Sequence, residues 1–206
     1  MGQENLLFGI GNIFGTSVKT CNFAKEFETY MIFTETKLKG AFIIDLQKRE
    51  DERGFFARTF CADEFAKHGL STHMPQSNMS YSKSKYTLRG MHFQVDGAEE
   101  AKLIRCTKGA ITDVIIDIRK DSATYCEHIA VDLTEKNHRM LYVPEGFAHG
   151  FITLVDDVEV TYQVSQFYTP GKERGIRWND PLFGIDWPTT QPIVSEKDAV
   201  HLDFKK

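Results

Sequence analysis

The sequence predicts a mainly β protein, a sandwich or barrel of short strands with one minor helix. Three observations favour this fold class. Apolar side chains alternate with polar ones over several short stretches, and turn residues separate these stretches. One segment, described below, has the charge pattern of a short helix. No period of about 20–50 residues repeats and no low-complexity linker divides the chain, so a single β domain is expected.

The composition is that of an ordinary globular domain. The chain has 206 residues, of which 41% are hydrophobic and 26% are charged, enough for a buried core. A net charge of −4 gives no basic footprint for nucleic acid or a membrane surface, and no apolar run approaches the roughly 18–20 residues of a membrane span. The four cysteines have neither CxxC pairing nor regular spacing, so we expect reduced thiols in a cytoplasmic protein.

The first thirty residues carry the weakest signal. They mix glycine, asparagine and scattered apolar residues without a sustained period. They also lack the charged region, apolar core and small-residue cleavage site of a signal peptide. We therefore expect one domain over residues 31–206, preceded by an N-terminal extension of uncertain structure at residues 1–30.

The expected strands are short stretches in which side chains alternate or apolar residues cluster. One of them is apolar on both faces, with Asp113 and Asp117 on the face that carries Ile111 and Ile115. The expected strands cover residues 32–36, 42–46, 101–106, 111–119, 128–133, 140–143, 151–155 and 158–164.

The segment Cys61–Gly69 is the best candidate for a helix. Asp63 and Glu64 suit its first turn, and Gly69 can end it in the left-handed conformation. A charged turn is expected before it at residues 48–52, and an irregular, packed, non-helical tail from Lys172 onward.

The stretch Leu88–Gln94 places an arginine, a glycine and a histidine within four residues. His92 titrates close to neutral pH and can both take and return a proton. The guanidinium of Arg89 fits phosphate oxygens, and Gly90 lets a backbone or ligand approach closely. Taken alone, the stretch also fits a strand with one satisfied histidine and one surface arginine.

Strand parity singles out two further polar side chains. Tyr162 shares the apolar face of the strand 158–164 with valines, so it points inward, either as a core aromatic or as a general acid in a ligand cavity. Lys102 shares a parity with Ile104, and an inward lysine is costly unless it is paired. The alternative is a lysine at the start of a strand that escapes to solvent.

The remaining candidates are ambiguous singly. His149, after a Pro-Glu-Gly turn, could be structural, and the run 195–198 could be a solvated charge cluster. His92 and His149 could be two metal ligands, but spacing marks no third histidine or carboxylate. We therefore expect a site without metal.

Together these motifs resemble the dTDP-4-dehydrorhamnose 3,5-epimerase family, enzymes of nucleotide-sugar metabolism. The resemblance runs from about Met31 to Ala199, and residues 1–30 have no counterpart. It implies a cupin-type jelly-roll barrel with a few short helices, and a homodimer in which a strand crosses to the partner. The motifs are Asp51–Phe56, Gln76–Ser80, Leu88–Gln94, Ala101–Cys106, Asp113–Arg119, Tyr142–Phe151, Tyr162, Tyr168, Trp178–Pro181 and Ser195–Ala199.

The resemblance implies acid–base chemistry beside the C4 ketone of a sugar. His92 is then the general base that removes the proton, and Asp198 is the carboxylate that orients its imidazole. Tyr162 returns a proton on the opposite face of the sugar. Lys102 and His149 hold the C4 oxygen while negative charge builds on it. No cofactor is implied.

The resemblance also implies a set of contacts to the nucleotide diphosphate. Arg53 and Arg89 clamp the diphosphate, and Tyr168 stacks on the base. Further substrate-contacting positions are Phe56, Arg58, Gln76, Asn78, Glu173 and Lys197.

Arg58 departs from the family pattern. Thymidine-specific members carry a glutamate five residues after the first arginine, where this chain has an arginine. A group that only accepts hydrogen bonds has become one that only donates them. The hypothesis is a changed nucleotide or 4-keto sugar; the alternative is that Arg58 turns to solvent and thymidine still binds.

The sequence thus predicts a nucleotide-sugar epimerase that inverts C3, C5 or both, beside the C4 ketone of a 4-keto-6-deoxyhexose nucleotide. A mono-epimerase of another nucleotide sugar is the first alternative, because the same residues serve one inversion or two. A ketoisomerase also needs a base beside a carbonyl. A non-catalytic nucleotide-sugar binding protein is the alternative from another class.

Overall fold

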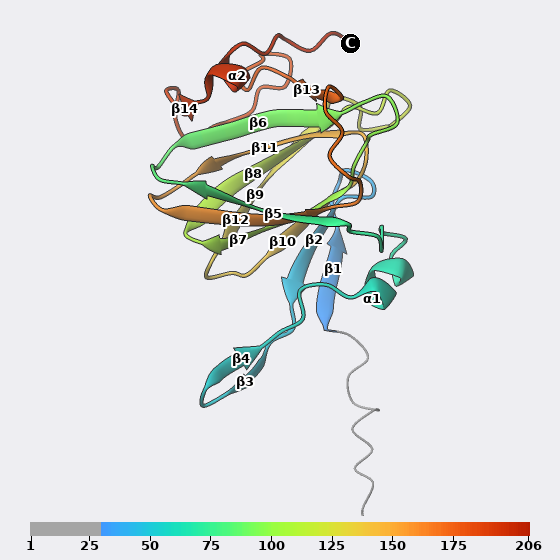
Figure 1. The fold of residues 1–206 in the computed structure, drawn as a ribbon, viewed down its shortest axis with the longest axis vertical. Coiled ribbons are helices and arrows are strands. Elements are labelled where there is room, and N and C mark those ends of the chain that lie inside the picture. The colour runs from blue at the N-terminus through green and yellow to red at the C-terminus, as the bar shows by residue number, and fades with distance from the viewer. Residues whose placement is uncertain (1–29) are drawn as a thin grey trace, which may run out of the picture.

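Residues 30–206, which the computed structural model describes, form two facing sheets and a projecting hairpin (Figure 1). The strands are β1 (Met31–Glu35), β2 (Phe42–Leu46), β3 (Arg49–Asp51), β4 (Gly54–Phe56), β5 (Gln76–Ser82), β6 (Thr87–Gln94), β7 (Lys102–Lys108), β8 (Ala110–Asp117), β9 (His128–Thr134), β10 (Met140–Val143), β11 (Phe147–Thr153), β12 (Val158–Val164), β13 (Glu173–Gly175) and β14 (Ile193–Val194), and the helices are α1 (Ala62–Lys67) and α2 (Glu196–Ala199). The first sheet has the order β1-β2-β10-β7-β12-β5, and the second has the order β13-β6-β11-β8-β9, with β14 beside β6. The predicted mainly β jelly roll with a few short helices is confirmed.

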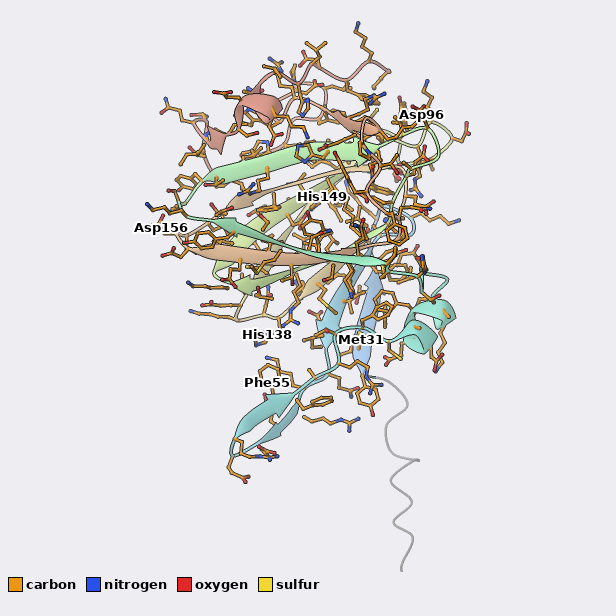
Figure 2. The ribbon with its side chains drawn as sticks, in the orientation of Figure 1. Met31, Phe55, Asp96, His138, His149 and Asp156 are labelled. Carbon is orange, nitrogen blue, oxygen red and sulfur yellow. The ribbon has the colours of Figure 1, made fainter. Side chains whose placement is uncertain are left out.

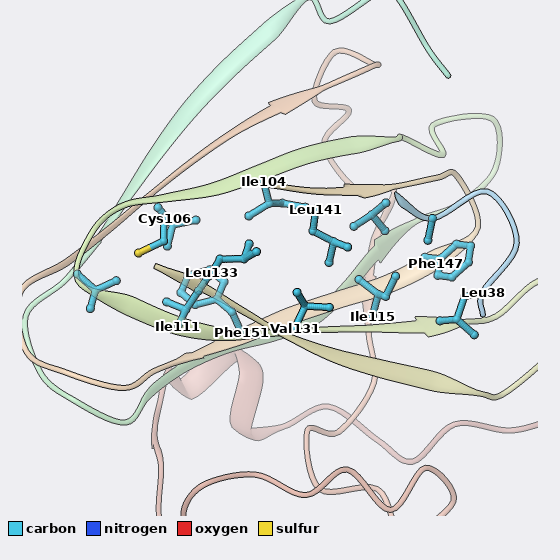
Figure 3. Close-up of a cluster of buried hydrophobic side chains, with 14 residues drawn as sticks. Leu38, Ile104, Cys106, Ile111, Ile115, Val131, Leu133, Leu141, Phe147 and Phe151 are labelled. Atoms are coloured by element: carbon cyan, nitrogen blue, oxygen red, sulfur yellow. The ribbon is translucent and has the colours of Figure 1, made fainter. Parts of the chain in front are cut away.

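Apolar side chains fill the space between the two sheets (Figure 3). Ile104 and Leu141 come from the first sheet, and Ile111, Ile115 and Phe151 from the second; none is more than 5% exposed. Burying one such side chain stabilises the fold by roughly 1.5–3 kcal/mol. The cluster therefore holds the sheets at a fixed separation, which fixes the walls of the cavity described below.

The outer faces of both sheets are covered as well. Phe65 of α1 and Leu70 pack on the first sheet, and Ile176 and Phe183 of the C-terminal tail pack on the second. Val114 of β8 faces this second cluster, while its neighbour in the strand faces the space between the sheets. A strand buried on both faces needs apolar residues at both parities, which β8 has.

Several predicted elements match the structure closely. The strands 42–46, 140–143 and 158–164 have the predicted bounds. The predicted helix forms as α1, between an N-cap at Cys61 and Gly69, whose φ of 69° is left-handed. The cysteines among the described residues are free thiols, as predicted, and Cys21 lies outside those residues.

Three local predictions were wrong. The charged turn at 48–52 contains the strand β3, which pairs with β4. The strand predicted at 151–155 begins at Phe147 and ends at Thr153, because the whole segment pairs with β8. The tail was predicted to be non-helical, yet it contains α2, whose first turn is capped by Ser195 Oγ accepting from the backbone N–H of Asp198.

The hairpin of β3 and β4 projects away from the two sheets (Figures 1 and 2). Phe55 and Phe56 on this hairpin are 46% and 60% exposed. No helix in the part of the chain that the structure describes is long and apolar enough to cross a membrane.

Candidate active site

His92 and Asp198 form a partly buried imidazole–carboxylate pair, although 106 positions separate them in the sequence. His92 Nε2 lies 2.7 Å from Oδ1 of Asp198, whose side chain is only 5% exposed. The other carboxylate oxygen accepts a hydrogen bond from the backbone N–H of Gly90 at 3.3 Å. Because Nε2 faces the carboxylate, Nδ1 is the ring nitrogen left to exchange a proton with a ligand.

The pair borders two adjoining cavities of about 230 and 290 Å³, which lie between the two sheets. His92, Lys102 and Tyr162 line both cavities, so these three side chains stand where the cavities meet. His92 comes from β6 of the second sheet, whereas Lys102 and Tyr162 come from β7 and β12 of the first. A ring held between them is therefore approached from two sides.

Burial, followed by the negative charge of Glu100, raises the pKa of Tyr162 above its usual value, although Arg89 works against them. At neutral pH its hydroxyl is therefore protonated and can donate a proton. Burial opposes ionisation of Asp198, but the hydrogen bond from His92 and the amide of Gly90 hold the pKa of Asp198 below its usual value. The pair thus presents an ionised carboxylate to the imidazole.

Two basic side chains of the cavity each have a carboxylate partner. Nζ of Lys102 lies 2.5 Å from Oε1 of Glu100, and both side chains are nearly buried. Nε2 of His149 lies 2.7 Å from Oδ1 of Asp113, which is fully buried; the two atoms are in contact without the alignment of a hydrogen bond. Figure 2 shows His149 between the sheets.

The outer part of the two cavities contains most of the other predicted contact residues. Nζ of Lys197 lies 2.5 Å from Oε2 of Glu173, and this contact raises the pKa of Lys197. Arg89 is held by Ser82 and by the backbone carbonyl of Tyr81. The predicted contact residues that line one cavity or both are Gln76, Asn78, Arg89, Lys102, His149, Tyr168, Glu173 and Lys197.

Three predicted contact residues lie elsewhere. Arg53 is at the tip of the β3–β4 hairpin, where its side chain is 82% exposed and pairs with Asp51. Phe56 is on the same hairpin and is exposed. The guanidinium of Arg58 lies over the ring of Tyr30, 3.9 Å from its centroid. None of the three lines the cavities of its own chain.

Gly90 serves a backbone contact. A Cβ at Gly90 would lie 2.5 Å from the Cα of Gly150, on the neighbouring strand β11. The two glycines allow β6 and β11 to approach closely, next to the position where His92 of β6 lies opposite His149 of β11. Of the two predicted reasons for this glycine, the approach of a backbone is the one the structure shows.

Sequence reasoning missed three titratable side chains of the site. Asp113 and Glu100 pair with the predicted residues His149 and Lys102. The parity of Asp113, on the apolar face of its strand, was the available signal. His201 lies 3.7 Å from Asp198 and follows it by three positions, a spacing that brings side chains together on a helical turn.

His92, Asp198 and His201 have ligand atoms within 4.8 Å of one another. Two of these atoms are already joined as a hydrogen-bonded acid–base pair. We therefore treat the cluster as acid–base machinery and assign no metal to it.

Comparison with known proteins agrees with this geometry. A relative from Methanothermobacter thermautotrophicus, named dTDP-4-dehydrorhamnose 3,5-epimerase, is 44% identical over 169 residues, covering 81% of this chain and 90% of the relative. A crystal structure of that enzyme from Bacillus anthracis, with TDP and pyrophosphate bound, has a TM-score of 0.82 at 40% identity and covers 84% of this chain and 99% of that one. A dTDP-6-deoxy-D-glucose-3,5-epimerase from Legionella pneumophila, in complex with dTDP-4-keto-L-rhamnose, has a TM-score of 0.79 at 35% identity and covers 84% of this chain and 92% of that one.

The family model for dTDP-4-dehydrorhamnose 3,5-epimerase matches residues 35–206, which include every side chain of the two cavities. The protein therefore belongs to the dTDP-4-dehydrorhamnose 3,5-epimerase family.

Proposed function

We propose that this protein epimerises a 4-keto-6-deoxyhexose nucleotide at C3, C5 or both, beside the C4 ketone. One observation carries the proposal: His92, a base with a carboxylate partner, and Tyr162, a protonated acid, reach the same cavity from opposite sheets. Inversion needs a proton acceptor and a proton donor on opposite faces of the ring, because one group acting alone returns the proton to its original face.

The first step is removal of the proton on the carbon beside the ketone. Nδ1 of His92 takes this proton, the C–H electron pair moves into the ring, and the C4 carbonyl becomes an enolate. The imidazolium that forms is stabilised by the ionised Asp198 at 2.7 Å. The ketone itself makes the neighbouring C–H acidic, so the step requires no cofactor.

The enolate oxygen develops negative charge that must be stabilised in the cavity. The ammonium of Lys102 and the imidazole of His149 both line the cavity and can donate to this oxygen. Their carboxylate partners, Glu100 and Asp113, hold them in place. Tyr162 then donates its hydroxyl proton to the carbon from the other face, and solvent restores the proton of Tyr162 and removes that of His92.

The nucleotide occupies the outer part of the cavities in this proposal. Arg89 and Lys197 supply positive charge for a diphosphate, and Tyr168 offers an exposed aromatic ring for the base. The relatives crystallised with TDP or a dTDP sugar support a nucleotide-diphosphate sugar as the substrate class.

We further propose that the protein is a homodimer whose β3–β4 hairpins reach the partner's cavity. The hairpin exposes Phe55 and Phe56, and the edge strand β5 exposes Met79 and Tyr81. Each surface exposes large apolar side chains among polar ones, and β5 is an unpaired strand edge, which favours association with a second chain. Arg53 and Phe56 would then complete a site that their own chain leaves without them.

Incubation with candidate 4-keto-6-deoxy nucleotide sugars in heavy water tests the function directly. NMR then reports which carbon exchanges its proton for deuterium and which configuration results. We expect exchange at C3, C5 or both with the native protein, and none above background with His92→Ala. Replacement of His73, an exposed histidine outside the cavities, should leave exchange intact. Unchanged exchange in the His92→Ala variant would exclude His92 as the base.

A further inference from the structure

His201 lies against the base pair in a space that a glycine leaves open. Its ring sits over Gly175 of β13, and Gly175 pairs with His92 in the strand register. A Cβ at Gly175 would lie 2.1, 2.3 and 2.4 Å from three atoms of the His201 ring. Any larger residue at position 175 would expel the ring, so the placement of His201 depends on this glycine.

His201 faces the same carboxylate oxygen that His92 uses. Its Nε2 lies 3.7 Å from Oδ1 of Asp198, and the rings of the two histidines meet edge to face with centroids 5.8 Å apart. Nε2 of His201 is buried and has no hydrogen-bond partner among the described residues. A movement of about 0.7 Å would bring it to hydrogen-bond distance from Oδ1. A buried donor without a partner favours that movement.

The surroundings of His201 favour its neutral form, chiefly through burial. Burial, and then the positive charge of His92, lowers the pKa of His201, and Lys197 acts in the same direction. Asp198 and Glu173 oppose this shift. A neutral imidazole can donate one N–H to the carboxylate without adding a second positive charge beside His92.

We propose that His201 is a positioning residue that shares Oδ1 of Asp198 with His92 and thereby extends the activity of the base to lower pH. The effect on catalysis rests on the proposed function, whereas the effect of His201 on the protonation of His92 is independent of that function. A carboxylate that accepts from two donors stabilises a charged His92 less than one that accepts from His92 alone. Sharing the carboxylate with a neutral His201 therefore lets His92 release its proton at a lower pH.

The direct test is a pH titration of the histidine rings, monitored by NMR in the full chain without substrate. We expect His201→Leu to move the midpoint of the His92 titration upward by about 0.5–1 pH unit, the size expected when one hydrogen bond of ordinary net strength is lost. His201→Gln should move it less, because the amide nitrogen of glutamine can donate to the same oxygen. The exposed His73→Leu serves as the matched control and should not move it.

The acid limb of the pH profile of kcat/KM should move to higher pH in the same order, most in His201→Leu, less in His201→Gln and not in His73→Leu. KM at high pH should stay unchanged. Gly175→Ala is an independent route, because it displaces the ring without changing the histidine, and it should also move the midpoint upward. A midpoint that stays fixed or falls in both His201→Leu and Gly175→Ala would overturn the inference. If the midpoint rises but no sugar exchanges its protons, the effect of His201 on His92 stands and the proposed function fails.

Discussion

Pairing two different inactive chains tests whether the hairpin acts on the partner's cavity. Arg53 is 82% exposed and its side chain pairs only with Asp51 of the same hairpin among the described contacts, so Arg53→Ala should leave the fold intact. If Arg53 binds the diphosphate of the partner's substrate, its loss removes a charged contact of about 1.5–3 kcal/mol, or roughly 10–100-fold in kcat/KM. His92→Ala removes the base and should abolish turnover.

A dimer with one chain of each kind has one intact site in this arrangement. That site takes His92 from the Arg53→Ala chain and Arg53 from the His92→Ala chain, while the other site lacks both. We expect such dimers, purified by two different tags, to have about half of the native activity per dimer at low substrate concentration. The assay is the rate of epimerisation below KM, compared with each parent variant alone.

The matched control pairs a native chain with a chain that carries both substitutions. If the hairpin crosses, neither site of this dimer is complete, and activity should fall to the level of the Arg53→Ala parent or below. If Arg53 serves its own chain, the control keeps one intact site and the mixed dimer keeps none. That reversed pattern, or a monomer in light scattering, would refute the crossing.

Three further experiments test the roles of Tyr162, Arg58 and Asp117. Tyr162→Phe should retain deuterium exchange through His92 but lose inversion by about 10²-fold or more, measured by NMR; equal loss of both would give Tyr162 another role. If Arg58 has changed the nucleotide, calorimetric titration with dTDP-, CDP-, GDP- and UDP-sugars should favour one other than dTDP, and a clear preference for dTDP would end the hypothesis. Burial disfavours the charged form of Asp117, but hydrogen bonds from its neighbours outweigh burial and lower its pKa to about 2. The contribution of Asp117 to the free energy of unfolding is therefore complete above the usual carboxyl pKa range and is lost as the pH falls toward 2. Asp117→Ala should therefore cost about 3 kcal/mol in urea unfolding at pH 7 and much less near pH 2, whereas the half-exposed Asp45→Ala should cost under about 1 kcal/mol at both; a pH-independent cost for Asp117 would contradict the shift.

The strands of the two sheets could be predicted where local pattern and tertiary environment agree. Val158–Val164 alternates because one face meets the core, and the pattern gave both the strand and the inward direction of Tyr162. The strand β5 was not predicted, because its side chains are mostly polar and its place is set by pairing with β12. The short strand β3 was hidden in a charged run for the same reason.

The site was predictable where a residue's own strand reveals its direction. The parity of Lys102 left two directions open, inward or out to solvent, and the structure shows it nearly buried beside the partner Glu100 that makes its burial tolerable. By contrast, the contact of His201 with Gly175 has no local signal, because it depends on how the tail folds back over β13. The hairpin residues Arg53 and Phe56 lie outside the cavities, and in the proposed dimer they would meet the partner's cavity.

Asp198 illustrates why a charged run at the end of a chain can be misread. Locally, the run 195–198 has the composition of a solvated cluster, yet Asp198 is 4% exposed. Its position is fixed by the pairing of β14 with β6, by the cap from Ser195 and by the amide of Gly90. The cap is local to the tail, but the pairing with β6 and the contact with Gly90 need the tail to dock on the second sheet. Since His92 gains its carboxylate by that docking, the base becomes complete only in the fully folded barrel.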